Sequence, residues 1–128
     1  MGGKVAIITG GSRGIGKAVV EKFAGAGIKV YFTYANSEDS AAKLAEKCGA
    51  TAIRCPQNDS EKIAETVDKI YAENGTIDIL VNNAGITRDN FLMLMPKASW
   101  REVIETNLDG AYEWTKCVAK KMYARKSG

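Results

Sequence analysis

The sequence predicts an α/β protein built on a doubly wound parallel sheet, and three observations support this prediction. Short apolar runs such as Val5–Ile8 alternate with longer segments whose apolar residues recur at helical spacing. No repeat or low-complexity linker interrupts this alternation. Polar motifs follow the first and fourth apolar runs, and a strand order of 3-2-1-4 with right-handed crossovers would bring the ends of those two strands together.

Each strand and helix is predicted from its own pattern. The four strands, predicted from apolar runs, cover residues 4–9, 29–34, 51–55 and 77–81. Three of the four helices, predicted from apolar residues at helical spacing, cover about residues 14–25, 38–48 and 97–125. The remaining one begins near Ser60, its first residue left open, and ends at Asn74-Gly75. Glycines at positions 49 and 75 mark the C-terminal ends of the second and third helices. The predicted apolar face of the last helix consists of Trp100, Val103, Ile104, Leu108, Ala111, Val118 and Met122.

The composition restricts the classes of protein to which the chain can belong. It has 128 residues, of which 45% are hydrophobic and 26% are charged, as in one soluble globular domain. No apolar run is long enough for a membrane span, no signal-peptide pattern precedes the first strand, and a net charge of +3 does not indicate nucleic acid. Three widely spaced cysteines predict free thiols in a reducing cytoplasm, and without histidine no metal site is predicted.

A glycine-rich turn, Thr9-Gly10-Gly11-Ser12-Arg13-Gly14-Ile15-Gly16, joins the first strand to the first helix. Backbone N–H groups and the positive end of the helix dipole meet at such a helix N-terminus and attract anions. Gly10 allows a tight turn, Gly14 lets a phosphate approach the backbone, and Gly16 lets the helix pack closely. We therefore predict that the turn binds the pyrophosphate of a dinucleotide; a packing turn without a ligand is the alternative. The predicted binding residues are Gly10, Ser12, Arg13, Gly14, Ile15 and Gly16.

The end of the second strand predicts which dinucleotide binds. NAD-specific sites usually carry an acidic residue there, which holds the ribose 2′-hydroxyl. Residues 33–36 are Thr-Tyr-Ala-Asn and supply no carboxylate. Arg13 is expected to project toward the same region, where a cation stabilises a 2′-phosphate. We therefore predict NADP(H), with Ala35 and Asn36 beside Arg13 and Ser12; a solvated surface arginine is the alternative for Arg13.

A second polar motif, Asn82-Asn83-Ala84-Gly85, follows the fourth strand. Buried side-chain amides must be hydrogen-bonded, so we expect Asn82 and Asn83 to hold neighbouring loops and the cofactor ribose. Ala84 and Gly85 are small enough for the nicotinamide half to pass close to the backbone. Asn83, Ala84 and Gly85 are therefore predicted to bind the cofactor, and a purely structural turn is the alternative.

These motifs resemble those of the short-chain dehydrogenase/reductase family, and the resemblance covers essentially the whole chain. The first motif has the spacing Thr-Gly-x-x-x-Gly-x-Gly, and the run from Asn82 to Asp89 looks most like the 3-oxoacyl-[acyl-carrier-protein] reductases of bacterial fatty-acid synthesis. The resemblance implies a Rossmann fold and NADPH-dependent reduction of a 3-oxoacyl thioester on acyl carrier protein to the 3-hydroxyacyl form. The alternatives are an acetoacetyl-CoA reductase or another short-chain ketoreductase and, in a different class, a non-catalytic nucleotide-binding or interaction module.

The resemblance also implies a contact with the adenine ring after the third strand. Members of the family usually carry an aspartate there that accepts a hydrogen bond from the adenine amino group. Asn58-Asp59 stand at about that place and are predicted to bind the cofactor. Asn-Asp-Ser is also favourable chemistry for the start of a helix, and the sequence leaves both interpretations open.

Asn107 interrupts the apolar stripe of the last helix, between Ile104 and Leu108, and Gly110 follows it. This pair predicts a local kink with a freed carbonyl or a bound water. The resemblance matches Asn107 to the catalytic asparagine of the family, which holds a water in a proton relay to a lysine. A hydrogen-bonded core asparagine is the alternative.

The family places further catalytic residues beyond a helix like the one predicted over residues 97–125. They are a serine after a fifth strand and a Tyr-x-x-x-Lys pair on the next helix. We therefore interpret residues 1–128 as the N-terminal dinucleotide-binding portion of a single Rossmann domain, with the C-terminal strands absent. This portion alone is expected to be inactive.

Basic residues crowd the end of the last helix, and they have two interpretations. They complement the negative end of the helix dipole, or they form a docking patch for an acidic acyl carrier protein. They are Lys116, Lys120, Lys121, Arg125 and Lys126. The apolar residues of the 86–96 loop are expected to flank the acyl chain or to contact another subunit. The resemblance implies a homotetramer, and no nucleic acid or membrane partner is predicted.

Overall fold

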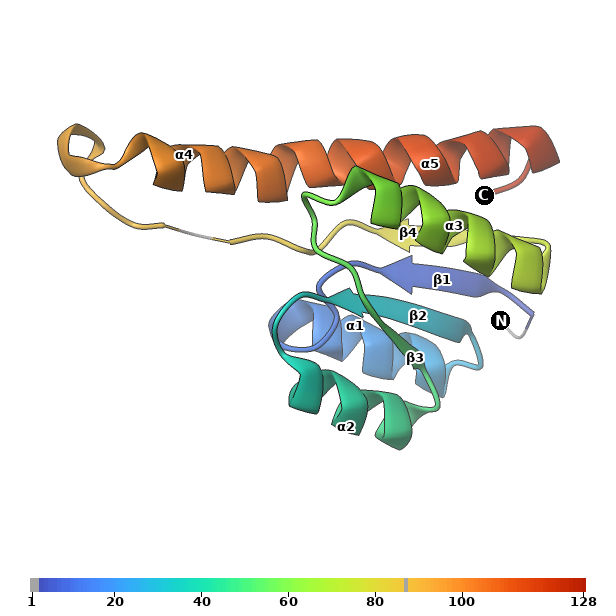
Figure 1. Cartoon of the computed structure of the whole chain (residues 1–128). Coiled ribbons are helices and arrows are strands. Elements are labelled where there is room, and N and C mark those ends of the chain that lie inside the picture. Colours follow the sequence, from blue (N-terminus) through green and yellow to red (C-terminus); the bar gives the residue numbers. More distant parts are fainter. Residues whose placement is uncertain (1–2, 87) are drawn as a thin grey trace.

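The computed structural model describes residues 3–86 and 88–128, and its four parallel strands form one sheet in the order β3-β2-β1-β4 (Figure 1). The strands are β1 (Val5–Ile8), β2 (Lys29–Tyr34), β3 (Thr51–Arg54) and β4 (Ile79–Val81). In the middle of the sheet, Ile7 of β1 pairs with Tyr31 of β2 on one side and with Leu80 of β4 on the other. The predicted doubly wound α/β sheet is confirmed, and its first and fourth strands are neighbours.

Helices cover both faces of this sheet, as a doubly wound fold requires. Two helices, α1 and α2, lie on one face, and α3 and α5 lie on the other (Figure 1). A π-helical turn, η2, joins α4 to α5, and a 3₁₀ turn, η1, precedes α4. In the described ranges, no helix has the length and apolar character needed to cross a membrane. The bounds are α1 Gly14–Gly25, α2 Glu38–Cys48, α3 Ser60–Asn74, η1 Leu92–Leu94, α4 Lys97–Ile104, η2 Glu105–Asp109 and α5 Gly110–Arg125.

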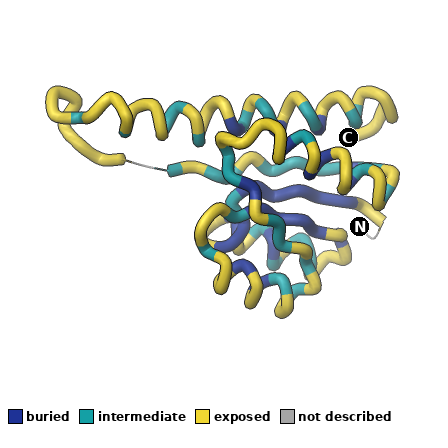
Figure 2. Tube along the Cα trace, viewed as in Figure 1, coloured by how far each residue is buried: buried dark blue, intermediate teal, exposed yellow. Residues whose placement is uncertain are grey.

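The central strand β1 contributes to two apolar cores. Val5 and Ile7 pack beneath α3 and α5, whereas Ala6 and Ile8 pack beneath α1 and α2. All four residues are buried, and Figure 2 shows β1 as a continuous buried segment. A parallel strand covered on both faces has to be apolar at every position, which explains why this run does not alternate with polar residues.

The last helix does not bury all of the residues that its apolar pattern predicts. Trp100 and Leu108 were predicted to be on the apolar face, but they are 53% and 60% exposed, whereas Trp114 is fully buried. The π turn adds a residue to one helical turn and so changes which face of α4 continues into α5. It lies at the place where Asn107 and Gly110 predict a kink, yet the helix runs straight through it and α4 extends past the sheet (Figure 1).

Asp78 fastens the beginning of β1 to the segment that leads into β4. Its carboxylate accepts hydrogen bonds from the Val5 backbone N–H (2.8 Å) and from the Thr76 hydroxyl (2.9 Å), and Arg125 lies 3.9 Å away. Burial opposes the charge, but these hydrogen bonds and the cations Lys4 and Arg125 hold the pKa of Asp78 below its ordinary value. The ionised carboxylate therefore stabilises the folded chain.

We predict that Asp78→Asn lowers the free energy of unfolding at pH 7 by about 1.5–3 kcal/mol, the usual worth of hydrogen bonds to a charged group. Because the folded-state pKa is lowered, the stabilisation is complete above the unfolded-state pKa near 4 and is lost as the pH falls through the folded-state value. Urea unfolding at pH 7 and pH 3 should therefore show a smaller difference at pH 3. Asp89→Asn, at an exposed position, is the control, and an equal loss at both pH values contradicts the prediction.

Candidate functional site

One buried hydroxyl joins the ends of β1 and β4. Thr9 follows β1 and is 1% exposed. Its Oγ1 accepts hydrogen bonds from the backbone N–H groups of Asn83 and Ala84, each at 3.1 Å, and donates to the carbonyl oxygen of Val81 at 3.4 Å. The turn after β4 therefore cannot separate from the turn after β1 without leaving a buried hydroxyl and two N–H groups without these partners.

The glycine-rich turn also interlocks sterically with the segment after β4. Asn83 Nδ2 donates a hydrogen bond to the Gly10 carbonyl oxygen at 2.9 Å. The φ of Gly10 is +66°, and a Cβ atom there would lie 2.8 Å from Cα of Ala84. A Cβ atom on Gly16 would collide with the Gly10 carbonyl oxygen and with Asn83 Nδ2. The close approach expected of Gly16 is thus present, but its neighbours are the turn and Asn83.

A crevice of about 450 Å³ lies between these two turns, which is within the size range of small-molecule sites. Nine residues predicted to bind the cofactor line it, namely Gly10, Ser12, Arg13, Gly14, Ala35, Asn36, Asn83, Ala84 and Gly85. Among the described residues, six others line it that the sequence did not predict, namely Thr33, Tyr34, Ser37, Cys55, Ile86 and Thr106. Tyr34, Ser37 and Ile86 adjoin predicted residues in the chain and Thr33 lies two positions from Ala35, so extending each motif by one or two residues would have found them. Cys55 and Thr106 lie in no motif, and only the fold brings them to the crevice.

Asn58 and Asp59 do not line the crevice, and their contact with the adenine ring stays a prediction. The Asp59 carboxylate accepts a hydrogen bond from the Lys62 backbone N–H at 3.0 Å and caps α3. Asn58 lines a separate hollow that faces acidic residues of η2. Residues 55–59 connect β3 to α3, and within this segment Asp59 has the helix-start role while Cys55 lines the crevice.

The first turn of α1 has the chemistry of an anion site. No side chain caps this helix N-terminus, so its backbone N–H groups are suited to an anionic ligand. A Cβ atom on Gly14 would meet nothing within 4 Å, which leaves room for a phosphate against the backbone. Ile15 does not line the crevice and is 78% exposed. Gly16 does not line it either, because it packs against Asn83.

The charges of the crevice also suit a phosphorylated ligand. Among the described residues that line the crevice, Arg13 is the one lysine, arginine, aspartate or glutamate. Burial raises the pKa of the Cys55 thiol to about 11, so Cys55 is uncharged at neutral pH. The residues present therefore fit a dinucleotide whose pyrophosphate lies against the backbone from Gly10 to Gly14.

Asn107 holds the loop that forms the far wall of the crevice. Its Oδ1 accepts a hydrogen bond from the Ile86 N–H (2.8 Å) and its Nδ2 donates to the Ile86 carbonyl oxygen (3.0 Å). A Cβ atom on Gly85 would lie 3.2 Å from the same Oδ1. A second hollow of about 410 Å³ adjoins the crevice here, lined by Arg13, Gly85, Ile86, Arg88 and Asn107. Asn107 therefore fixes the backbone at the junction of the two hollows.

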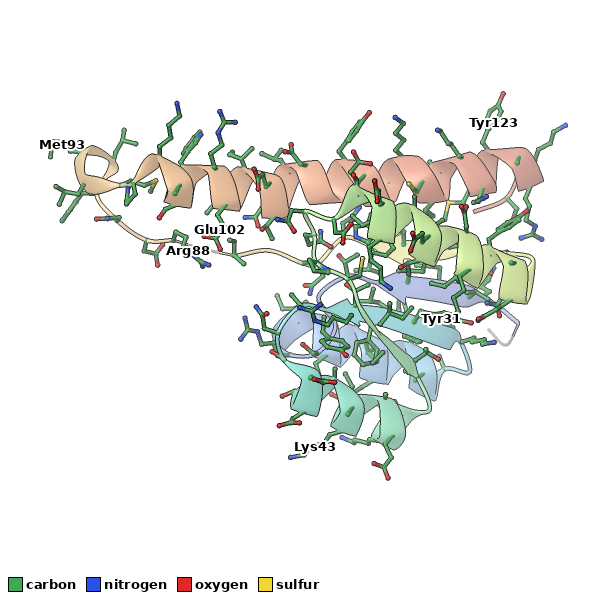
Figure 3. The ribbon with its side chains drawn as sticks, in the orientation of Figure 1. Tyr31, Lys43, Arg88, Met93, Glu102 and Tyr123 are labelled. Carbon is green, nitrogen blue, oxygen red and sulfur yellow. The ribbon has the colours of Figure 1, made fainter. Side chains whose placement is uncertain are left out.

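Beyond this junction, residues 88–104 form an arm that extends past the sheet (Figure 1). Arg88 and Glu102 face each other across it in an ion pair with a 2.6 Å N–O distance (Figure 3). Met93 lies at the tip of the arm (Figure 3) and is 92% exposed, and Leu92, its neighbour in η1, is 80% exposed. Apolar side chains gathered in this way usually mark a contact surface.

A Tyr-x-x-x-Lys spacing occurs in α5 at Tyr112 and Lys116, but neither residue lines the crevice. Tyr112 is 59% exposed, and Lys116 Nζ lies 5.6 Å from the centre of its ring. The pair is therefore on the outer face of α5. In the parts of the chain that the structure describes, no Tyr–Lys pair of this spacing reaches the site.

Comparison with known proteins agrees with this geometry. The family model for short chain dehydrogenases matches residues 4–128. The chain is 44% identical to the 3-oxoacyl-[acyl-carrier-protein] reductase FabG of Escherichia coli, covering 98% of this chain and 52% of that protein. It is 37% identical to FabG of Staphylococcus epidermidis, covering 98% and 53%. The chain thus spans about half the length of the curated relatives it matches.

Solved structures of the same family have the same fold. A metagenomic short-chain oxidoreductase in complex with NADP superposes with a TM-score of 0.89 at 32% identity, covering all of this chain and 60% of that one. A Burkholderia cenocepacia short chain dehydrogenase in complex with NADP also has a TM-score of 0.89, at 31% identity, covering 93% and 51%. With the crevice between the ends of β1 and β4 and the match along residues 4–128, the chain belongs to the short-chain dehydrogenase family.

Proposed function

We propose that this chain supplies the cofactor-binding portion of an NADPH-dependent reductase that converts 3-oxoacyl thioesters on acyl carrier protein to 3-hydroxyacyl thioesters. The observation that carries the proposal is the crevice in which the glycine-rich turn and the segment after β4 are held together by Thr9. The names of the FabG relatives support the substrate class. NADPH would supply the hydride when bound, and the residues of this chain would bind and orient it.

The preference for NADPH over NADH rests on charge. Arg13 and Asn36 line the crevice, and no carboxylate lines it among the described residues. Arg13 would form a charge-assisted hydrogen bond with the 2′-phosphate, and Asn36 would add a neutral donor. The solved relatives in complex with NADP support the same choice.

The nicotinamide half would lie along Asn83, Ala84 and Gly85, toward the second hollow. Asn107 acts there first as a positioning residue, because both ends of its amide hold the Ile86 backbone. Gly85 packs against the same amide and is kept at the wall of the crevice. The water relay that the family resemblance implies for Asn107 remains part of the proposal.

Acyl carrier protein is the proposed carrier of the substrate, and the basic end of α5 is its proposed docking patch. Lys121 and Arg125 are engaged within the chain, since Lys121 lies 3.0 Å from Asp68 and Arg125 pairs with Asp78. Lys120 and Lys126 are exposed. These two lysines are therefore better suited than Lys121 and Arg125 to attract an acidic partner.

The exposed arm supports association with other copies of the chain, in line with the homotetramer that the family resemblance implies. An acetoacetyl-CoA reductase is the alternative within the family, and it would have no need of a protein docking patch. In a different class, the alternative is a non-catalytic nucleotide-binding or interaction module.

We predict that the chain binds NADPH about ten- to a hundredfold more tightly than NADH, because one charge-assisted hydrogen bond is worth about 1.5–3 kcal/mol. Arg13→Ala should remove most of this preference by weakening NADPH binding alone. Lys22→Ala, which removes a charge at the other end of α1, should retain the preference. Fluorescence titration of both dinucleotides measures the constants, and equal constants in the unsubstituted chain contradict the cofactor assignment.

We predict that Lys120→Glu combined with Lys126→Glu weakens binding of an acidic acyl carrier protein by about three- to tenfold, since exposed charge pairs contribute modestly. The control pair, Lys22→Glu with Lys43→Glu, makes the same change in net charge on α1 and α2. Isothermal titration with 3-oxoacyl carrier protein measures the effect. If both pairs weaken binding equally, the docking patch is not at the end of α5.

A further inference from the structure

The strand β3 lies at the edge of the sheet and pairs only with β2 among the described elements. It contains no proline, so its outer edge presents backbone groups to which another strand can add. The Cys55 N–H donates to the Tyr34 carbonyl oxygen at 3.0 Å, so the backbone groups of Cys55 point toward β2. Along a strand, the backbone groups of successive residues point alternately toward one neighbour and the other. The backbone groups of Ala52 and Arg54 therefore point outward, away from β2.

A groove of about 380 Å³ runs between this edge strand and α3. Its floor includes the side chains of Ile53 and Ile70, which belong to the core beneath α3. The register of β3 places Thr51 beside Tyr31, and the Tyr31 hydroxyl donates to Glu73 at 3.0 Å. The C-terminal end of α3 therefore lies beside the beginning of β3, and the two elements run in opposite directions.

The face of α3 that borders the groove carries charges of alternating sign. In chain order they are Lys62, Glu65, Lys69 and Glu73, and all four are exposed. None of them takes part in the ion pairs found within the described ranges. When this series is reversed, as it is in a copy related by a twofold axis, each positive position meets a negative one.

We propose that two copies of this chain associate through antiparallel pairing of β3, which joins their sheets into one. Centred on Ile53, the pairing lets the N–H and carbonyl of Ala52 bond those of Arg54 in the second copy, and the reverse. The two Ile53 side chains would meet at the axis on the groove face. Lys62 and Glu65 would then face Glu73 and Lys69 of the second copy.

This interface is separate from the apolar arm, which lies at the other end of the sheet order beyond β4 (Figure 1). It also leaves the crevice open, because none of Ala52, Ile53 or Lys69 lines it. The proposed dimer therefore does not depend on the proposed function.

Sedimentation equilibrium of the whole chain tests the proposal through its dimer dissociation constant. Lys69→Glu sets like charges against Glu65 of the second copy at two symmetric places and should raise the constant about tenfold or more. Glu65→Lys combined with Lys69→Glu restores complementarity and should return the constant to within about threefold of the original. Lys43→Glu is the control, since Lys43 lies on α2 away from the groove (Figure 3) and should change nothing.

Ala52→Pro tests the strand pairing itself. The substitution removes an outward-pointing N–H but no hydrogen bond to β2, so circular dichroism should show an intact fold. The dimer dissociation constant should rise at least about tenfold. Three results would each overturn the proposal. They are a monomeric unsubstituted chain at every concentration, unchanged association in both Lys69→Glu and Ala52→Pro, or failure of the charge exchange to restore association.

Discussion

The site depends on the hydrogen bonds that the Thr9 hydroxyl makes. This hydroxyl accepts hydrogen bonds from two consecutive backbone N–H groups of the segment after β4, at Asn83 and Ala84. Because these partners lie more than seventy residues away in the chain, the bonds can form only once β1 and β4 are neighbours in the sheet. The crevice is thus a consequence of strand order, and the glycines at positions 10 and 16 are needed because the two turns lie so close together.

The rest of the fold supports this junction. The buried strand β1 is covered on both faces, so its end is held in place by two cores at once. At its beginning, the carboxylate of Asp78 binds the Val5 N–H and ties β1 to the segment before β4. On the outer side, Asn107 holds Ile86 and Asn82 Nδ2 donates to the Thr115 hydroxyl at 2.9 Å. The segment after β4 is therefore fixed from the sheet and from the last helix.

Local pattern and topology rules were enough to predict the sheet, its strand order and the convergence of the two motifs. They left open the role of one segment with two chemically reasonable functions, and they failed where geometry departs from an ideal helix. Asp59 is a good cap and a good hydrogen-bond acceptor, and the structure shows its role as the cap of α3. Trp100 and Leu108 follow helical spacing, but the π turn and the length of the arm leave them exposed. Cys55 and Thr106 could not be found, because no local signal marks a residue that reaches the crevice through the fold.

The central claim is that one dinucleotide lies across both turns. Backbone amide chemical shifts of the chain, recorded by NMR while NADPH is added, test this claim most directly. The account predicts shifts that saturate together at Gly10, Ser12 and Gly14 on one side and at Asn83, Ala84 and Gly85 on the other. Shifts confined to one turn, or an unchanged spectrum at saturating NADPH, would contradict it.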